Sequence, residues 1–315
     1  MFLARDFIVT TEGLVFAVTL SGLEEGRIVA CLRYVPEADG LRKVDTAEAE
    51  EILHRHPHYR YRSPCRDAVL QAVPVDRVRR HLQPRRRLRE LLASDRDDPL
   101  IRRLRKIVAL LAEQGLNVGR LGITGSLLVG AHTPRSDLDL VCYGTRTFDQ
   151  VREAVRRLTA EGRLADLSEE LWHTTWRRRG CALDFPTWLW HERRKHTKGA
   201  IDGTKFDLIL VEEKTVADDP RPWRKEGRKT LRATVIDASA AFATPARYRL
   251  DHPQIREALC FTATYVGQAR RGETVEIAGQ VEVSPDGERR VIVGASREAP
   301  GEYIRVIGAR GDAHV

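Results

Sequence analysis

Two aspartates one residue apart lie in an apolar run of the chain, where charge is unusual. Asp137 and Asp139 belong to the stretch GITGSLLVGAHTPRSDLDLV, residues 122–141. Side chains alternate along a strand, so both carboxylates would share one face, roughly 7 Å apart, with leucines on the other face. Carboxylates this close repel, and one takes up a proton unless a cation compensates them. Hard oxygen ligands of this kind favour Mg²⁺ or Mn²⁺.

A Gly-Ser turn precedes this aspartate pair. Gly125 and Ser126 follow a short apolar run, and the residues after them start a short helix. Backbone N–H groups at such a turn point outward together and bind phosphate. Gly125 permits a close backbone approach, and Ser126 adds a hydroxyl. The sequence therefore predicts a phosphate site beside a divalent-cation site.

Together these residues resemble the signature of the polymerase-β-type nucleotidyltransferase superfamily, in its minimal and CCA-adding-like branches. The matching residues are Gly125, Ser126, Gly130, Ser136, Asp137 and Asp139. The resemblance implies a mixed sheet flanked by helices and a third carboxylate on a later strand. Asp207, in the apolar run KFDLILV, fits that third position.

The resemblance also implies a reaction, the two-metal transfer of a nucleoside monophosphate from an NTP to an acceptor hydroxyl, with release of pyrophosphate. Asp137 and Asp139 would hold both ions. Asp207 would complete the site of the ion that activates the acceptor hydroxyl. The turn at Gly125 and Ser126 would hold the β- and γ-phosphates.

The triphosphate contacts depart from the family pattern. Many minimal members have an arginine two or four residues after the serine, where this chain has Leu127, Leu128 and Val129. The charge of the triphosphate must then be met elsewhere, and the run RRKHTKG at 193–199 is cationic and well suited to phosphate, with a solvated turn as the alternative. The candidate nucleotide-binding residues are Gly125, Ser126, Arg135, Ser136, Lys195, Lys198 and Lys205.

Helices and strands that would position the site follow from local patterns. Asp98 as N-cap and Pro99 at the first helical position predict a helix that ends at Gly115. A capping box of Thr147 and Gln150 predicts the start of a second helix. Asp207 lies in a predicted strand.

Three segments are expected, in an α+β fold. Residues 1–92 form an N-terminal α/β segment with a basic run, and residues 93–225 form the nucleotidyltransferase core. Residues 226–315 form a β-rich module with a barrel-like pattern of short strands and glycine turns. The polar stretch 217–230 predicts a linker, and HPQIREALCFTATYV, residues 252–266, predicts a short helix.

The charge of the chain suits a nucleic-acid partner. The net charge is +8, the isoelectric point is about 9.4, and most of the cations are arginines. A basic run upstream of the core predicts phosphate contacts with RNA, with a solvated helix face as the alternative. The candidate RNA-binding residues are Arg77, Arg79, Arg80, Arg85, Arg86 and Arg87.

Four function classes fit these patterns. The favoured one is an enzyme that adds nucleotides to an RNA 3′ end, with tRNA as one candidate acceptor. The alternative is transfer to a protein or small-molecule hydroxyl, as in antitoxin-like or antibiotic-modifying members. A non-enzymatic RNA-binding protein and a DNA polymerase or repair enzyme complete the set. No pattern in the sequence names a protein partner.

Membrane and cysteine-based classes are not expected. No apolar run approaches the roughly 20 residues of a membrane span, and the N-terminus lacks the features of a signal peptide, so we expect a cytoplasmic protein. The five cysteines are widely separated and form no C-x-x-C pair, which argues against a zinc or disulfide framework. His54, His56 and His58 surround Pro57, and this spacing favours a polar loop over a metal cluster.

Overall fold

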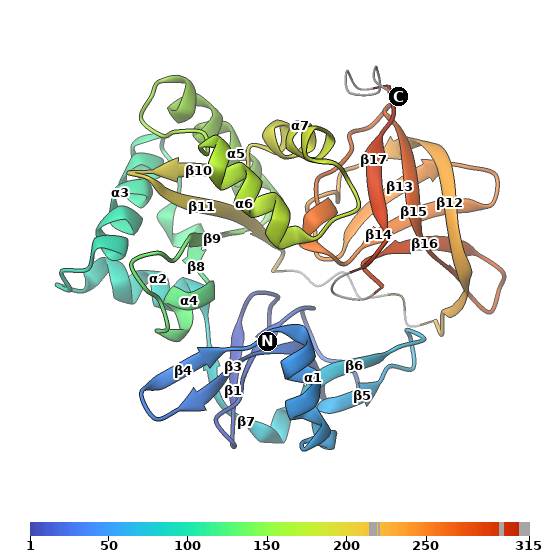
Figure 1. Ribbon diagram of the computed structural model, residues 1–315, viewed down its shortest axis with the longest axis horizontal. Helices are drawn as coiled ribbons and strands as arrows, with labels where there is room; N and C mark the ends of the chain where they lie inside the picture. Colours follow the sequence, from blue (N-terminus) through green and yellow to red (C-terminus); the bar gives the residue numbers. More distant parts are fainter. Residues whose placement is uncertain (214–218, 220, 296–298, 309–315) are drawn as a thin grey trace. The chain divides into compact units, whose positions relative to one another are not determined.

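The computed structural model describes residues 1–213, 219, 221–295 and 299–308. It divides into two compact units, shown with their elements in Figure 1. Unit 1 comprises Met1–Ser63, Ala68–Asp166 and His196–Val216, and unit 2 comprises Pro64–Asp67, Leu167–Lys195 and Ala217–Val315. The mixture of helices and sheets is the α+β class expected from the sequence. No helix among the described residues combines the length and apolarity needed to cross a membrane.

The segment division of the chain differs from the one expected. Unit 1 contains the N-terminal segment except Pro64–Asp67, together with most of the expected core, so no unit boundary falls near residue 92. Residues 167–195 of the expected core belong to unit 2.

Unit 1 begins with an antiparallel sheet in the order β5-β6-β3-β2-β1-β7, to which β4 adds beside β3. Its strands are β1 (Phe7–Thr10), β2 (Val15–Val18), β3 (Arg27–Glu37), β4 (Gly40–Lys43), β5 (Arg60–Arg62), β6 (Val69–Pro74) and β7 (Val78–Leu82). Helix α1 (Thr46–His54) and the 3-10 turn η1 (Pro57–Tyr59) lie between β4 and β5. A turn at Glu12 and Gly13 joins β1 to β2.

One face of this sheet is closed by apolar side chains. Ile8, Phe16 and Leu32 from three strands meet Leu53 of α1 and Tyr59 of η1, all without solvent exposure. Burial of side chains this large contributes roughly 1.5–3 kcal/mol each. The contact fixes the segment that carries His56 and His58 against the strands that carry Glu12.

The second part of unit 1 is a four-stranded mixed sheet in the order β10-β11-β9-β8. Its elements are α2 (Pro84–Ala93), α3 (Pro99–Glu113), β8 (Leu121–Ile123), α4 (Gly125–Val129), β9 (Leu138–Tyr143), α5 (Thr145–Ala160), β10 (Lys198–Ile201) and β11 (Thr204–Val211). Strands β9 and β11 are parallel, and the other two pairings are antiparallel. Helix α5 packs against β9 and β11.

The two faces of this sheet carry different side chains. Leu138, Leu140 and Phe206 are completely buried on one face. The other face carries the aspartates and, further along the strands, an apolar group of Val141, Tyr143 and Val211 against which Leu3 packs. The aspartate face is therefore the one that the N-terminal residues cover.

Helix α3 forms as predicted. The carboxylate of Asp98 accepts hydrogen bonds from the N–H groups of Leu100 (2.8 Å) and Ile101 (3.1 Å), and Pro99 is the first helical residue. The predicted start of the next helix at Thr147 is wrong, because α5 begins at Thr145 without a side-chain cap. Gly144, at a φ of 86°, turns the chain directly from β9 into this helix.

Unit 2 contains a closed barrel, in agreement with the β-rich module predicted for the C-terminal segment. Its elements are α6 (Glu169–Arg179), α7 (Phe185–Lys195), β12 (Arg224–Asp237), β13 (Ala246–Asp251), β14 (Ile255–Cys260), β15 (Thr274–Val283), β16 (Arg289–Val293) and β17 (Tyr303–Val306). Pairing runs β12-β13-β14-β16-β15, and β15 also pairs with β12, which closes five strands into a ring. Strand β17 pairs with β15.

Two local predictions in unit 2 are wrong. The expected linker 217–230 becomes a strand from Arg224 onward, because β12 pairs with β15 along its length and its polar side chains face solvent. Residues 217, 218 and 220 of that stretch lie outside the described residues. The helix expected at 252–266 is instead β14 and a short 3-10 turn, since pairing with β13 and β16 satisfies its backbone.

Asp98 provides a test of how α3 is held. The Asp98→Ala variant leaves two N–H groups of the first turn without their acceptor, so the free energy of unfolding should fall by about 1 kcal/mol. Hydrogen exchange at the Leu100 and Ile101 amides should accelerate accordingly. The matched control is Asp97→Ala, because Asp97 is a neighbouring, exposed aspartate that caps nothing. Equal exchange rates in both variants would contradict the capping role.

Candidate active site

The register of two parallel strands brings the aspartates together. Asp139 of β9 and Asp207 of β11 are direct Cα partners across the strand pair. Asp137 precedes β9 by one residue and shares the face of Asp139. Side-chain exposure is 33% for Asp137 and 14% for Asp207, so the group is recessed but reachable. Three carboxylates from two neighbouring strands therefore lie on one partly buried face.

Gly125 stands directly against this group. Its φ is +67°, a left-handed conformation that side chains rarely adopt, and a Cβ placed there would collide with Oδ2 of Asp139. The preceding residue, Thr124, donates its backbone N–H to the carbonyl of Asp139 at 3.0 Å. The predicted Gly-Ser turn and the aspartate pair are thus adjacent, and a Cβ at position 125 would require the Asp139 carboxylate to move.

The N-terminal sheet holds the turn in place. Thr124 Oγ1 donates to the carbonyl of Arg5 at 2.7 Å. Leu128 of α4 packs with Phe7, Val15 and Tyr34 from β1, β2 and β3. The residues that follow Ser126 are therefore apolar because they pack against this sheet.

A side chain of α2 also supports α4. Arg87 of α2 donates from Nε to the carbonyl of Leu127 at 2.9 Å, a bond that caps the otherwise open end of this short helix. Neither Arg5 nor Arg87 was assigned to the site from the sequence. Both act through backbone contacts that no spacing pattern encodes.

Two lysines counter part of the carboxylate charge. Lys205 forms ion pairs with Asp207 and, at 3.3 Å, with Asp137, while Lys198 pairs with Asp207 at 3.3 Å. Burial alone would lower the pKa of Lys205, but the carboxylates of Asp207 and Asp137 raise it above its ordinary value. The ammonium of Lys205 therefore stays charged while it is buried.

The charge of Asp139 is opposed by burial and by the neighbouring carboxylates. Burial, together with the Asp207 and Asp137 carboxylates, raises the pKa of Asp139 to about 6. Lys205 and Arg5 act in the opposite direction and compensate only in part. A group of carboxylates whose shared charge is not fully neutralised fits a divalent cation with oxygen ligands.

The carboxylates do not lie in the arrangement of a closed metal cage. Among the described residues, one group of potential ligands has its atoms all within 4.8 Å of one another, and it consists of Glu12, His56 and His58 rather than the aspartates. The ammonium of Lys205, which pairs with Asp137 and Asp207, separates these two aspartates. Their donor set nevertheless consists of the oxygen ligands that a divalent cation prefers.

The nucleotide-binding candidates divide into two groups. Ser126, Ser136, Lys198 and Lys205 lie at or beside the aspartates or in the loop before them, and Ser136 Oγ accepts from the Thr133 N–H at 3.0 Å to shape that loop. Arg135 is exposed in the same loop. Lys195 lies in α7 of unit 2, where it is buried, ion-paired with Glu192 and bonded to the Thr264 carbonyl.

The basic run predicted to contact RNA is spread over η2 (Val75–Arg77), β7 and α2. Arg79, Arg80 and Arg86 are exposed. Four candidates make intramolecular contacts: Arg77, which is also exposed, with Glu12; Arg85 with Glu213 and the Tyr143 ring; Arg86 with Glu90; and Arg87 with Leu127. The exposed members form the part of the run that is available to phosphate.

Comparison with known proteins finds one relative that spans the chain. No family model matches the sequence, and no solved structure matches it either. The uncharacterized protein MJ1086 of Methanocaldococcus jannaschii is 30% identical over an alignment of 333 residues, which covers 96% of this chain and 98% of that protein. The alignment therefore spans nearly the whole of both chains.

The raised pKa of Asp139 predicts a dependence of stability on pH in chelator-treated protein. Its folded-state pKa is about 6 against an ordinary value of 3.8, so the folded state binds this proton more tightly than the unfolded state. Its contribution to stability is complete below about pH 4 and is lost as the pH rises through 6. The shift corresponds to at most about 3 kcal/mol.

The measurement is urea unfolding of wild type and Asp139→Asn between pH 4 and 8. The free energy of unfolding of the variant should rise relative to that of the wild type by up to about 3 kcal/mol as the pH rises to 7, because the variant has no charge to bury at this position. The control is Asp149→Asn, at an exposed aspartate of α5. A gain for Asp139→Asn that does not vary with pH would contradict the shifted pKa.

The contact between Gly125 and Asp139 can be separated from backbone strain. Gly130 also has a positive φ, +78°, but open space surrounds its Cβ position. Gly130→Ala should therefore cost about 1 kcal/mol of stability from strain alone. Gly125→Ala should cost about 1–3 kcal/mol more, because its methyl group overlaps the carboxylate. Thermal unfolding of both variants checks this difference. An equal loss of stability in the two variants would contradict the proposed contact.

Proposed function

The chain belongs to the family of the uncharacterized M. jannaschii protein, and we propose that it is a metal-dependent nucleotidyltransferase. In this proposal it moves a nucleoside monophosphate from an NTP to an acceptor hydroxyl and releases pyrophosphate. The core would be of the polymerase-β type, with Mg²⁺ or Mn²⁺ as cofactor. The acceptor that we favour is an RNA 3′ end, with tRNA as one candidate.

The observation that carries the proposal is the pairing of Asp139 with Asp207 in parallel strands, with Asp137 on the same face. Three carboxylates in this arrangement match the number and type of ligands that two-metal transfer requires. The Gly-Ser turn lies in contact with Asp139, where a triphosphate would have to lie. A pair of aspartates that only capped a turn would need no third carboxylate beside it.

The charges around the aspartates also suit a metal–triphosphate pair. The carboxylates would bind the cation, and the ammonium groups of Lys198 and Lys205 would be left to meet the phosphates. Both lysines are held beside Asp207 by ion pairs in the structure. This supplies cations near the turn, although Leu127, Leu128 and Val129 supply none.

Each residue of the site has a role in this proposal. Asp137 and Asp139 would hold both ions, and Asp207 would hold the ion next to the acceptor hydroxyl and accept its proton. The bound ions would stabilise the attacking and leaving oxygens of an in-line displacement. Gly125 and Ser126 would orient the β- and γ-phosphates through backbone N–H groups and the serine hydroxyl.

An RNA acceptor is favoured by charge. The chain carries a net charge of +8, and exposed Arg79, Arg80 and Arg86 lie on β7 and α2 of the same unit as the aspartates. Transfer to a protein or small-molecule hydroxyl remains the second candidate, and it requires no such cations. The identity of the labelled product distinguishes the two.

The test is transfer from each of four α-³²P-labelled NTPs with Mg²⁺ or Mn²⁺, in the presence and absence of total tRNA. Label should appear on RNA, and Asp137→Asn, Asp139→Asn and Asp207→Asn should each lower the rate about 100-fold or more. The matched control is Asp202→Asn, at an exposed aspartate in the turn before β11, which should keep wild-type activity.

Label on the protein or on a small molecule would contradict the proposal of an RNA acceptor but would still support nucleotidyltransferase activity. No transfer with either metal would overturn both. Transfer that survives the three aspartate variants would show that another site performs it.

A further inference from the structure

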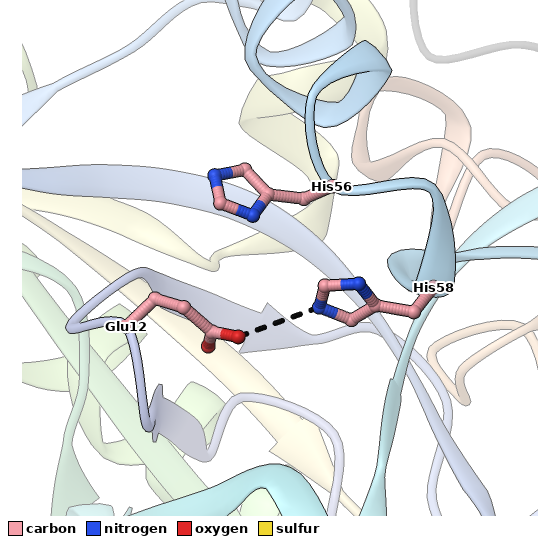
Figure 2. A group of neighbouring side chains, drawn as sticks. All are labelled: Glu12, His56 and His58. Carbon is pink, nitrogen blue, oxygen red and sulfur yellow. Dashed lines mark ion pairs between the residues drawn. The ribbon is translucent and has the colours of Figure 1, made fainter.

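Three side chains with metal-binding chemistry, Glu12, His56 and His58, lie together, as Figure 2 shows. Glu12 lies in the turn between β1 and β2, and His56 and His58 flank Pro57 at the start of η1. Each offers one ligand atom, and these atoms all lie within 4.8 Å of one another. More than 40 residues separate the glutamate from the histidines, so packing of α1 and η1 on the sheet creates the group.

The spacing of this group is close to that of a tetrahedral metal site. Ligand bonds of about 2.0–2.1 Å place tetrahedral donor atoms about 3.3 Å apart. Nε2 of His58 lies 3.4 Å from Oε1 of Glu12, which already matches that separation. The rings of His56 and His58 are 5.9 Å apart and perpendicular, at 89°, so their nitrogens can approach a shared point without ring overlap.

The ring nitrogen of His58 that faces Glu12 lacks a hydrogen bond. Nε2 is buried, and the described residues provide no hydrogen-bond partner for it. Buried polar atoms in this state are rare, because each costs roughly 1–3 kcal/mol. A bound cation would complete the coordination of this atom.

Glu12 is positioned by neighbouring hydroxyl groups. Tyr59 donates to Oε2 of Glu12, and Thr11 donates to the same oxygen at 3.0 Å. Oxygen Oε1 faces His58 and also meets Arg77. Fixing one carboxylate oxygen in this way orients the other, as supporting residues do around metal ligands.

We propose that Glu12, His56 and His58 bind a divalent transition-metal ion, with zinc as the best match. Two imidazoles and one carboxylate suit Zn²⁺ better than Mg²⁺, which prefers oxygen ligands. Three protein ligands leave a fourth position for water. The site shares no residue with the aspartates and does not depend on the proposed transferase activity.

Arg77 competes with the metal for the carboxylate. Its Nη1 lies 2.9 Å from Oε1 of Glu12. A cation at this distance opposes a second one, so Arg77 should weaken metal binding, and its removal should strengthen it. This gives the proposal a variant whose effect has the opposite sign to loss of a ligand.

Metal titration of the full chain tests the site. Protein stripped with chelator is titrated with Zn²⁺ in competition with a chromophoric indicator, in an Asp137→Asn and Asp139→Asn background that removes the other candidate site. We expect one Zn²⁺ per chain. Glu12→Gln, His56→Ala and His58→Ala should each weaken binding at least about tenfold. Arg77→Gln should tighten it.

The matched control is His54→Ala. His54 lies two residues from His56, but its Nδ1 is 2.7 Å from the Glu50 carbonyl and it is outside the group. Zinc should also raise the melting temperature of wild type and of this control, but not of the ligand variants. The proposal would be overturned if the protein with only the two background substitutions binds no zinc. It would also be overturned if the three ligand variants and Arg77→Gln all bind zinc with unchanged affinity.

Discussion

Crowding of negative charge where β9 and β11 run side by side is the constraint on which the candidate site depends. The parallel register makes Asp139 and Asp207 direct partners, and burial removes much of the water that would otherwise screen them. Lys205 and Lys198 offset part of this charge. These ammonium groups stabilise the arrangement of the three carboxylates, so the lysines support the site as well as being candidates for substrate contact.

The N-terminal sheet serves two parts of the chain at once. One of its faces closes over α1 and η1, and this packing assembles Glu12 with His56 and His58. Side chains of β1, β2 and β3 also meet Leu128, while the Arg5 carbonyl receives the Thr124 hydroxyl. A single layer thus supports both candidate metal-binding groups, although the two share no ligand.

Local chemistry was predictable from the sequence, and long-range packing was not. Strand alternation placed Asp137 and Asp139 on one face, the Asp98 and Pro99 pair set the start of α3, and short strands with glycine turns indicated the barrel. Two predictions were wrong because strand pairing overrode the local pattern. Strand β12 is polar, and it was predicted as a linker, yet it pairs with β15. Residues 255–260 have a helical pattern, yet they pair with β13 and β16. The sequence does not indicate that Glu12 lies beside the histidines, because only tertiary packing brings them together.

The apolar helix α4 has a consequence for how this protein can change. Leu128 is enclosed by Phe7, Val15 and Tyr34, and the turn before it depends on the Arg5 carbonyl. A charged residue at position 128 would have to be accommodated by simultaneous replacement of partners more than ninety positions earlier in the chain. Substitutions in the first strands and in the segment that carries the aspartates are therefore coupled, and the aspartate-bearing sheet depends on the N-terminal sheet for its packing.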